Sequence, residues 1–317
     1  MKIGTTGTSF ITKLLIESFI RTNNEVVAVS SRDIIKAKKL AEEYNISKYY
    51  DSYEMMLEDE DIDTIYIGLP NGLHYEYAKK ALLASKNVIV EKAFTVNYEQ
   101  ANELYELAIS KHLYLFEAIL TIHQPIVSKL KEDLKLIEPI HFANFNFSKY
   151  SSKYDDFKAL KNPNVFNKDM AGGALMDLNI YNLHLIEYLF GRANKYVYYA
   201  NNSGEIDTSG VAVFKYDNML VEAIACKDSD AKSRSIIMGE NGYIEIDEAT
   251  SIISHYILKL KDKDEVLIDL KDKDPYDYEI LSMMKVIEND LYDEHIKLLE
   301  HSLRVMKIVD KLNKATI

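Results

Sequence analysis

The chain has 317 residues, 47% hydrophobic and 28% charged, which is typical of a soluble globular protein with more than one core. Its net charge of −12 argues against nucleic acid or an anionic membrane as a partner, and no apolar run is long enough to span a bilayer. The single cysteine, Cys226, excludes an internal disulfide framework and a cysteine-based metal site. Because no signal-peptide pattern follows Met1, we expect a cytoplasmic protein.

The first part of the chain alternates apolar strands with amphipathic helices over short connections. Strands are expected at residues 1–6, 25–30, 49–50, 62–68, 88–90 and 113–118. Helices are expected from residue 10 to about 19 and at 34–44, 74–84 and 97–110. This alternation predicts an α/β fold with a doubly wound parallel sheet and right-handed crossovers.

The first predicted strand runs directly into a glycine and then a helix. This arrangement suits a dinucleotide pyrophosphate, because glycine allows close backbone approach and a helix N-terminus attracts an anion. Only Gly7 keeps the usual glycine spacing, since Ser9 and Thr12 occupy the second and third positions. A turn glycine without any ligand is the alternative. The expected cofactor contacts here are Gly7, Thr8, Ser9, Phe10 and Ile11.

The end of the second strand bears on the choice of cofactor. Enzymes that use NAD tend to carry an acidic residue there for the ribose hydroxyls, whereas this chain has Ser31 and Arg32. Arginine binds phosphate through two parallel hydrogen bonds, so the pair favours the 2′-phosphate of NADP. A surface arginine is the alternative, and the neighbouring Asp33 leaves NAD open.

The strand Val88–Val90 ends abruptly in Glu91 and Lys92. A lysine just past the carboxyl end of a buried parallel strand stands where open α/β sheets bind their ligands. An ordinary solvated loop lysine is the alternative, and only the other motifs of the chain favour the functional interpretation.

Residues 120–317 have a different pattern, with longer alternating strands and hairpin signals at Asp217-Asn218 and Asn241-Gly242. Helices are expected at 125–136, 172–190, 276–288 and 295–312, and the Lys- and Asp-rich segment 259–274 predicts a solvated hairpin. Strands are expected at 140–148, 196–200, 210–216, 219–227, 234–238, 243–247 and 251–260. We therefore expect an antiparallel sheet with helices on one face and a second subunit on the other.

The expected helix 172–190 carries Asp177, Tyr181 and His184 at spacings of four and three residues, which place them on one face. Their occurrence among Leu and Ile side chains suggests either a functional site or a buried polar cluster that satisfies its own hydrogen bonds. No third ligand stands at a useful spacing, so we expect no metal.

Taken together, these motifs resemble the Gfo/Idh/MocA oxidoreductases. The resemblance covers the glycine loop, Ser31-Arg32, the segment 63–74, Glu91-Lys92, the segment 172–177 with Tyr181, and residues 239–245. It implies a Rossmann domain at 1–119 and an α+β substrate and oligomerisation domain at 120–317. That second domain would carry a large open, mostly antiparallel sheet that forms a homodimer or tetramer, with the last helix packing back toward the first domain.

The resemblance also assigns roles by position. Lys92 corresponds to the catalytic lysine and Asp177 to the aspartate of the second motif. Tyr181 stands where many sugar and inositol dehydrogenases have histidine, which is similar to the branch of dimeric dihydrodiol dehydrogenase and glucose-fructose oxidoreductase. Further cofactor contacts are implied at Leu69, Pro70, Asn71, His74, Glu91 and Lys92, and substrate contacts at Lys92, Asp177, Tyr181 and His184.

The chain departs from the family pattern in three respects. Ala93 replaces a proline that is often cis in relatives, and we do not expect alanine to adopt a cis bond, which costs about 3 kcal/mol. Ser9 and Thr12 weaken the glycine loop. Asn179 replaces a usual glycine and is expected to reshape the pocket.

These assignments predict reversible hydride transfer between NADP, or NAD, and a hydroxyl-bearing carbon of a sugar, polyol or dihydrodiol. Tyr181 would be the general acid/base, with its pKa lowered from about 10 by the charge of Lys92, and Asp177 would hold Lys92 or the substrate hydroxyl. The pocket wall is expected from loops between Phe147 and Ala171. The alternatives are a dinucleotide-binding regulatory protein without turnover and an NAD-dependent glycosidase.

Overall fold

The computed structural model describes residues 1–316, which form two compact units. The first unit comprises Met1–Ala118 and Asp274–Leu303, and the second comprises Ile119–Lys273 and the residues from Arg304 onward. The long helix α11 (Tyr292–Lys314) therefore contributes to both units. The first change of unit lies beside the boundary expected at residue 119. The sequence assigned residues 274–303 to the second domain and expected only the last helix to pack back toward the first.

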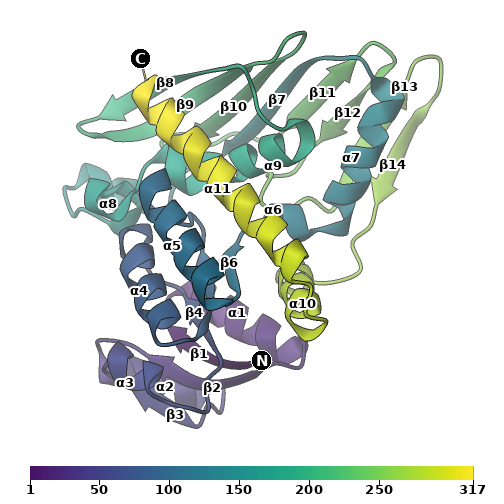
Figure 1. Cartoon of the computed structure of the whole chain (residues 1–317). Helices are drawn as coiled ribbons and strands as arrows, with labels where there is room; N and C mark the ends of the chain where they lie inside the picture. Colours follow the sequence, from purple (N-terminus) through teal and green to yellow (C-terminus); the bar gives the residue numbers. More distant parts are fainter. Residues whose placement is uncertain (317) are drawn as a thin grey trace. The chain divides into compact units, whose positions relative to one another are not determined.

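The first unit is built on a six-stranded sheet with the order β3-β2-β1-β4-β5-β6, in which neighbouring strands are parallel (Figure 1). Its strands are β1 (Lys2–Thr6), β2 (Glu25–Ser30), β3 (Lys48–Tyr50), β4 (Thr64–Ile67), β5 (Asn87–Glu91) and β6 (Leu115–Ala118). The central strands are buried on both faces, as expected for β-branched runs in a parallel sheet. The predicted doubly wound α/β fold is confirmed.

The helices of this unit mostly begin at polar capping residues whose side chains accept backbone N–H groups, as at Ser9, Asp33, Ser52 and Asn97. The sequence did not predict the short helix α3. The helices are α1 (Phe10–Arg21), α2 (Ile34–Glu43), α3 (Tyr53–Leu57), α4 (Asn71–Leu83), α5 (Tyr98–Lys111) and α10 (Pro275–Glu288).

Helix α10 joins the first unit because it packs against α1. The Asp277 carboxylate accepts hydrogen bonds from Ser18 at 2.8 Å and from the Arg21 guanidinium at 2.8 to 3.0 Å. Ile280 and Met283 lie in the same buried apolar cluster as the core residues of α1. These contacts join residues that lie far apart in the sequence, and local periodicity carries no information about them. The pattern of residues 276–288 therefore predicted a helix but not where that helix packs.

The second unit contains an eight-stranded sheet with the order β14-β13-β12-β11-β7-β10-β9-β8. Only β7 and β10 run parallel to each other as neighbours within it, so the expected mostly antiparallel sheet is confirmed for the described residues. Its strands are β7 (Ile140–Ser148), β8 (Lys195–Ser203), β9 (Ile206–Lys215), β10 (Leu220–Cys226), β11 (Ser235–Gly239), β12 (Gly242–Ile246), β13 (His255–Leu260) and β14 (Glu265–Asp269). Strands β13 and β14 form the hairpin predicted from the charged segment.

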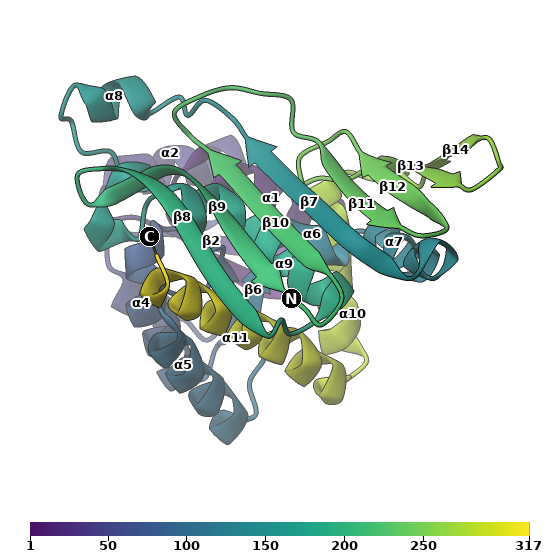
Figure 2. The ribbon, with the colours of Figure 1, turned by 90° about the horizontal axis from the view of Figure 1, so that it is seen from above.

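Figure 2 looks down on this sheet, with α6, α7 and α9 behind it on one face. The inward side chains alternate with outward ones along each strand, so Val221, Ala223 and Ala225 are fully buried. The helical segments are α6 (Leu120–His123), α7 (Pro125–Ile137), α8 (Tyr154–Lys158), η1 (Asn164–Phe166), η2 (Lys168–Met170), η3 (Leu175–Asn179) and α9 (Ile180–Phe190). Within residues 1–316, no helix has both the length and the apolar character needed to cross a membrane.

Candidate active site

The strand order of the first unit reverses between β1 and β4, and ligands of such sheets bind beyond the carboxyl ends of the strands at this switch point. The predicted cofactor residues follow the ends of four strands of this sheet. Gly7 to Ile11 follow β1, Ser31 and Arg32 follow β2, and Leu69 to Asn71 follow β4. Glu91 is the last residue of β5, and Lys92 comes directly after it. The structure thus brings the predicted cofactor loops to one edge of one sheet, while their contacts with the cofactor stay predictions.

The incomplete glycine loop is built around Gly7 and Gly68. Gly7 has φ +105°, and a Cβ there would collide with the carbonyl of Gly68. A Cβ at Gly68 would lie 2.5 Å from the Thr12 hydroxyl, so the loop after β4 makes room for the larger side chain. The Ser9 hydroxyl accepts the Thr12 N–H at 3.3 Å as the N-cap of α1. Ser9 and Thr12 thus order the helix N-terminus that would face a pyrophosphate.

The acidic residue beside Arg32 is already engaged in the fold. The Asp33 carboxylate accepts the N–H groups of Ile35 at 3.1 Å and Lys36 at 3.3 Å, so it caps α2. Arg32 is exposed and makes no ion pair with any residue between positions 1 and 316. An unengaged guanidinium beside a hydroxyl suits a phosphate, which favours the NADP interpretation of this strand end.

His74 is fully buried between two backbone carbonyl groups. Its Nδ1 lies 2.8 Å from the oxygen of Ala93, and its Nε2 lies 2.7 Å from the oxygen of Leu69. Burial lowers the pKa of His74, and a neutral imidazole donates to only one of these carbonyls. His74 therefore ties the loop after β4 to the loop after β5, and its direct contact with the cofactor remains a prediction.

The Lys92–Ala93 peptide bond is cis, so the expectation of a trans bond at this alanine was wrong. Tertiary contacts enclose the bond: Ala93 is fully buried with its carbonyl at His74, and the Phe94 N–H donates to the Glu117 carboxylate at 2.9 Å. The preference of alanine for a trans peptide bond is a property of the residue alone and takes no account of such contacts, so the sequence could not predict the cis bond. Lys92 itself is half-buried at the end of β5.

Glu91 belongs to a buried group of carboxylates that the sequence did not reveal. The Tyr66 hydroxyl donates to Glu91 Oε1 at 2.8 Å, and Glu117 and Glu279 are also almost fully buried. Burial raises the pKa of Glu91 to about 7, against opposing effects from the Tyr66 hydrogen bond and the Lys92 charge. Burial, followed by the charges of Glu91 and Glu117, raises the pKa of Glu279 well above its ordinary value.

We expect the raised pKa of Glu91 to make stability depend on pH. A carboxyl whose pKa is higher in the folded state stabilises the fold fully below its unfolded pKa of about 4.5, and this contribution is lost as pH rises through about 7. The free energy of unfolding should fall by up to about 3 kcal/mol between about pH 5 and about pH 8. The free energy of unfolding of Glu91→Gln, measured with urea at several pH values, should depend less steeply on pH. Glu58→Gln, at an exposed site, should show the pH dependence of the wild type. An unchanged slope in Glu91→Gln would contradict this assignment.

In the second unit, the segment before the candidate catalytic residues is shaped by Gly172 and Gly173. A Cβ on Gly172 would press on the backbone of residues 165–167, and one on Gly173, which has φ +112°, would collide with the Asp207 carboxylate. Asp207 also accepts the Leu175 N–H at 2.7 Å. The helix expected from residue 172 therefore starts later, with the π-helical segment η3 before α9.

Asp177 forms an ion pair that the sequence analysis missed. Its Oδ2 lies 2.8 Å from Nζ of Lys227, whose side chain is only 1% exposed. The same ammonium group donates to the Val165 carbonyl at 2.5 Å and lies 4.2 Å from the centre of the Phe166 ring. Lys227 thus connects the candidate catalytic aspartate to the loop that was expected to form the pocket wall.

The sequence contains a signal for Lys227. It continues the odd-numbered positions of β10, where Val221, Ala223 and Ala225 all face the covered side of the sheet. A lysine in phase with buried residues requires a partner, because an uncompensated buried charge is costly. The partner could not be named from the strand alone.

Tyr181, His184 and Asn179 have different surroundings. Tyr181 is half-buried, with its ring centre 5.8 Å from that of Phe147. His184 is fully buried, so its predicted substrate contact stays a prediction that burial disfavours. Asn179 is also fully buried, and its amide donates to the Ala223 carbonyl at 3.1 Å. Asn179 thus anchors the helical segment to β10, and its expected effect on the pocket stays a prediction.

Comparison with known proteins identifies the fold and the chemistry. The model of an oxidoreductase family with an NAD-binding Rossmann fold matches residues 1–118, and the GFO/IDH/MocA C-terminal domain matches residues 139–245. The chain belongs to the GFO/IDH/MocA oxidoreductase family. A scyllo-inositol 2-dehydrogenase (NADP(+)) of Bacillus subtilis is 28% identical over 97% of this chain and 94% of its own length. An uncharacterized oxidoreductase of Escherichia coli is 30% identical over 76% of this chain and 74% of its own.

Other GFO/IDH/MocA relatives match over shorter or more divergent stretches. A trans-1,2-dihydrobenzene-1,2-diol dehydrogenase of Xenopus tropicalis is 31% identical over 53% of this chain and 49% of its own. Among solved structures, a 3-ketoreductase of Actinomadura kijaniata in complex with NADP and TDP-benzene superposes with a TM-score of 0.89 at 21% identity, over 100% of this chain and 98% of that one. At this identity, the superposition supports the fold alone.

The protein is therefore an NAD(P)-dependent oxidoreductase that acts on CH–OH groups, as the resemblance implied. When bound, the nicotinamide cofactor supplies the hydride chemistry. The loops after β1, β2 and β4 fit such a cofactor, because the β1 loop is ordered around Gly7, the N-terminus of α1 is capped, and Arg32 is unengaged. The residues up to Thr316 contain no group of three His, Cys, Asp or Glu side chains placed to hold a metal ion.

Proposed function

We propose that this protein is an NADP-dependent dehydrogenase or reductase of a polyol or sugar hydroxyl group. The observation that carries the cofactor preference is the end of β2, where Asp33 caps α2 and leaves Arg32 beside Ser31 for a 2′-phosphate. The substrate class follows from relatives that act on scyllo-inositol and, in Hypocrea jecorina, on D-xylose with NADP(+).

In this proposal, Lys92, Asp177 and Tyr181 are the catalytic residues. Lys92 donates a hydrogen bond to the reacting oxygen and supplies a positive charge, and Tyr181 takes or gives the hydroxyl proton. Asp177 orients the substrate while the buried Lys227 holds its carboxylate in place. Polar and aromatic side chains between Phe147 and Ala171 complete the binding of the substrate.

The first experiment is a titration of the purified protein with NADPH and with NADH, following the emission of the reduced nicotinamide. The chain has no tryptophan, so the background is low. We expect tighter binding of NADPH, and Arg32→Gln should weaken it by about 10- to 100-fold with little change for NADH. Lys39→Gln, an exposed site on α2, is the matched control. Equal weakening of both cofactors, or a preference for NADH in the wild type, would overturn the NADP assignment.

A screen of inositols, sugars and dihydrodiols with the preferred cofactor then tests the substrate class. Cofactor binding without turnover of any of them would favour the regulatory protein. Hydrolysis of an aryl glycoside without net change in cofactor absorbance would favour the glycosidase.

We also propose self-association through the helix-free face of the eight-stranded sheet. On this face, Leu220 and Met238 are exposed and are both in register with Phe142, so three apolar side chains lie side by side. Light scattering should give the mass of a dimer or tetramer, and Met238→Lys should reduce it. A wild-type monomer would contradict this proposal.

The cytoplasmic location of the protein stays a prediction.

A further inference from the structure

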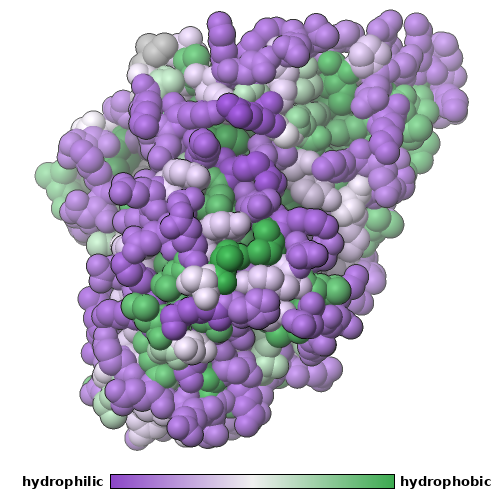
Figure 3. Space-filling view, viewed as in Figure 1, coloured by the Kyte–Doolittle hydropathy of each residue, from purple (hydrophilic) through white to green (hydrophobic). Residues whose placement is uncertain are grey.

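The second unit contains a strongly cationic cavity that the proposed reaction does not use. It lies between the C-terminal half of α11 and the turn that connects α9 to β8, and its volume is about 150 Å³. This is several times the space of about 30 Å³ that a water molecule occupies in the liquid. In Figure 3, hydrophilic side chains cover the outward side of this half of α11.

Helix α11 presents its basic residues to the cavity at helical spacing. Arg304, Lys307 and Lys311 are separated by three and four residues, so they lie on one face. Arg192, which follows the end of α9, is the fourth cation, and Glu187 is the only carboxylate among the lining residues. The lining therefore has a formal charge of +3 in a chain whose net charge is −12.

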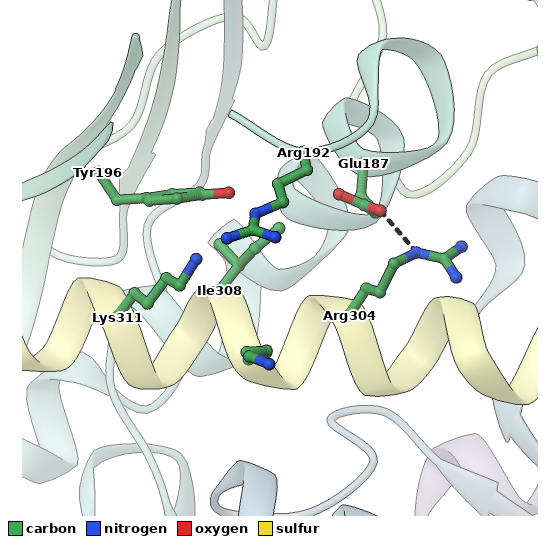
Figure 4. A pocket seen from close by; sticks show the side chains of 7 residues that line it. Glu187, Arg192, Tyr196, Arg304, Ile308 and Lys311 are labelled. Atoms are coloured by element: carbon green, nitrogen blue, oxygen red, sulfur yellow. Dashed lines mark hydrogen bonds and ion pairs between the residues drawn. The ribbon is translucent and has the colours of Figure 1, made fainter. Parts of the chain in front are cut away.

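Among the described residues, Glu187 makes its ion pair with Arg304 and not with Arg192 or Lys311. Its Oε1 accepts a hydrogen bond from Nε of Arg304 at 2.7 Å (Figure 4). Arg192 makes no ion pair with any other residue of the described chain. Burial, and then the charges of Arg192 and Lys307, lower the pKa of Lys311. Cations near helix C-termini are ordinary, but their convergence on one cavity is not explained by the helix dipole.

The donors at this end point toward one another. In Figure 4 the Tyr196 hydroxyl, the Arg192 guanidinium and the Lys311 ammonium converge on the same space. Nζ of Lys311 lies 4.5 Å from the centre of the Tyr196 ring, and the Tyr196 oxygen accepts the Ala193 N–H at 3.1 Å. The phenolic proton is donated to no other residue among positions 1–316, so it remains available to a ligand.

We propose that this cavity binds a phosphate group, either as inorganic phosphate or on a small phosphorylated metabolite. Arg192 and Lys311 supply charge-assisted hydrogen bonds, and Tyr196 supplies a third donor. A dianion relieves the repulsion between the cations, which water cannot do. The site belongs to the second unit alone and is independent of the cofactor and substrate of the proposed reaction.

Calorimetric titration with inorganic phosphate at constant ionic strength tests the site. NADP is present at saturating concentration, so that phosphate does not bind at the cofactor site. The same titration of Arg32→Gln without NADP gives a second control for binding at that site. We expect saturable binding to the wild type. Arg192→Met and Lys311→Met should each weaken it by about tenfold or more. Lys314→Met, an exposed site in the same last turn of α11, should bind phosphate as the wild type does.

Arg192→Met and Lys311→Met remove an exposed and a half-exposed cation, and a thermal unfolding scan without phosphate verifies that the two variants fold. Removal of a repelling cation should leave their Tm unchanged or higher. Absence of phosphate binding by the wild type, or equal binding by Lys311→Met and the wild type, would overturn the proposal. Loss of self-association in Lys311→Met without phosphate binding would overturn it in favour of a carboxylate from a second copy of the chain.

Discussion

Lys92→Met should lower kcat by about 10³-fold while the affinity for NADPH changes by less than about threefold. Methionine keeps the unbranched shape of lysine, one atom shorter, but removes its charge and its donors at the end of β5. The expected loss is large because Lys92 would stabilise charge on the reacting oxygen, which exists only as the hydride is transferred. Single-turnover measurement at saturating NADPH, together with the emission titration, separates chemistry from cofactor binding.

The matched control for this experiment is Lys39→Met, which removes an exposed lysine from α2 of the same unit. It should retain wild-type turnover. If Lys92→Met also turned over at the wild-type rate, Lys92 would have no part in the mechanism. If it lost NADPH binding instead, Lys92 would be a cofactor contact rather than a catalytic residue.

Asp177→Asn should destabilise the protein by about 2 to 4 kcal/mol in addition to lowering its activity. The substitution removes the carboxylate that neutralises the buried Lys227 ammonium, and an uncompensated buried charge is strongly unfavourable. Lys227→Met should cost less, about 1 to 2 kcal/mol, because the Asp177 side chain is 24% exposed and water can solvate it. Urea unfolding of both variants gives these values.

The double variant Asp177→Asn/Lys227→Met separates structure from chemistry. It contains neither charge, so its stability should exceed that of Asp177→Asn, with a coupling free energy of about 1 to 3 kcal/mol. Its kcat should nevertheless stay at least about 10²-fold below the wild type if Asp177 orients the substrate. Recovery of both stability and turnover would assign Asp177 a purely structural role. An additive loss of stability would show that the ion pair contributes little.

Much of the fold and of the cofactor edge follows from local sequence patterns. Apolar runs with short connections predict the parallel sheet, and the same pattern places Gly7, Ser31 and Lys92 just beyond strand ends, where the structure has them. Parallel strands in a doubly wound sheet all present their carboxyl ends at the same edge, so chain order alone brings these residues together.

The residues that tune the candidate site could not be assigned in the same way. Alternation along β10 places Lys227 on the covered face, but the pairing of strands and the π-helical start before α9 decide that Asp177 is its partner. Likewise, the sequence did not reveal that the Asp33 side chain folds back onto the N–H groups of its own helix and caps α2.

The sequence by itself determined most of the strands and long helices, the order of the motifs and the family, because periodicity and motif spacing are local properties of the chain. The tertiary structure alone decided that Lys227 holds Asp177, that the Lys92–Ala93 bond is cis, and that α10 packs on α1. It also decided that Arg192 and Lys311 face one cavity. Each of these depends on contacts between segments far apart in the sequence, and the energies of such contacts are set by packing and charge in three dimensions.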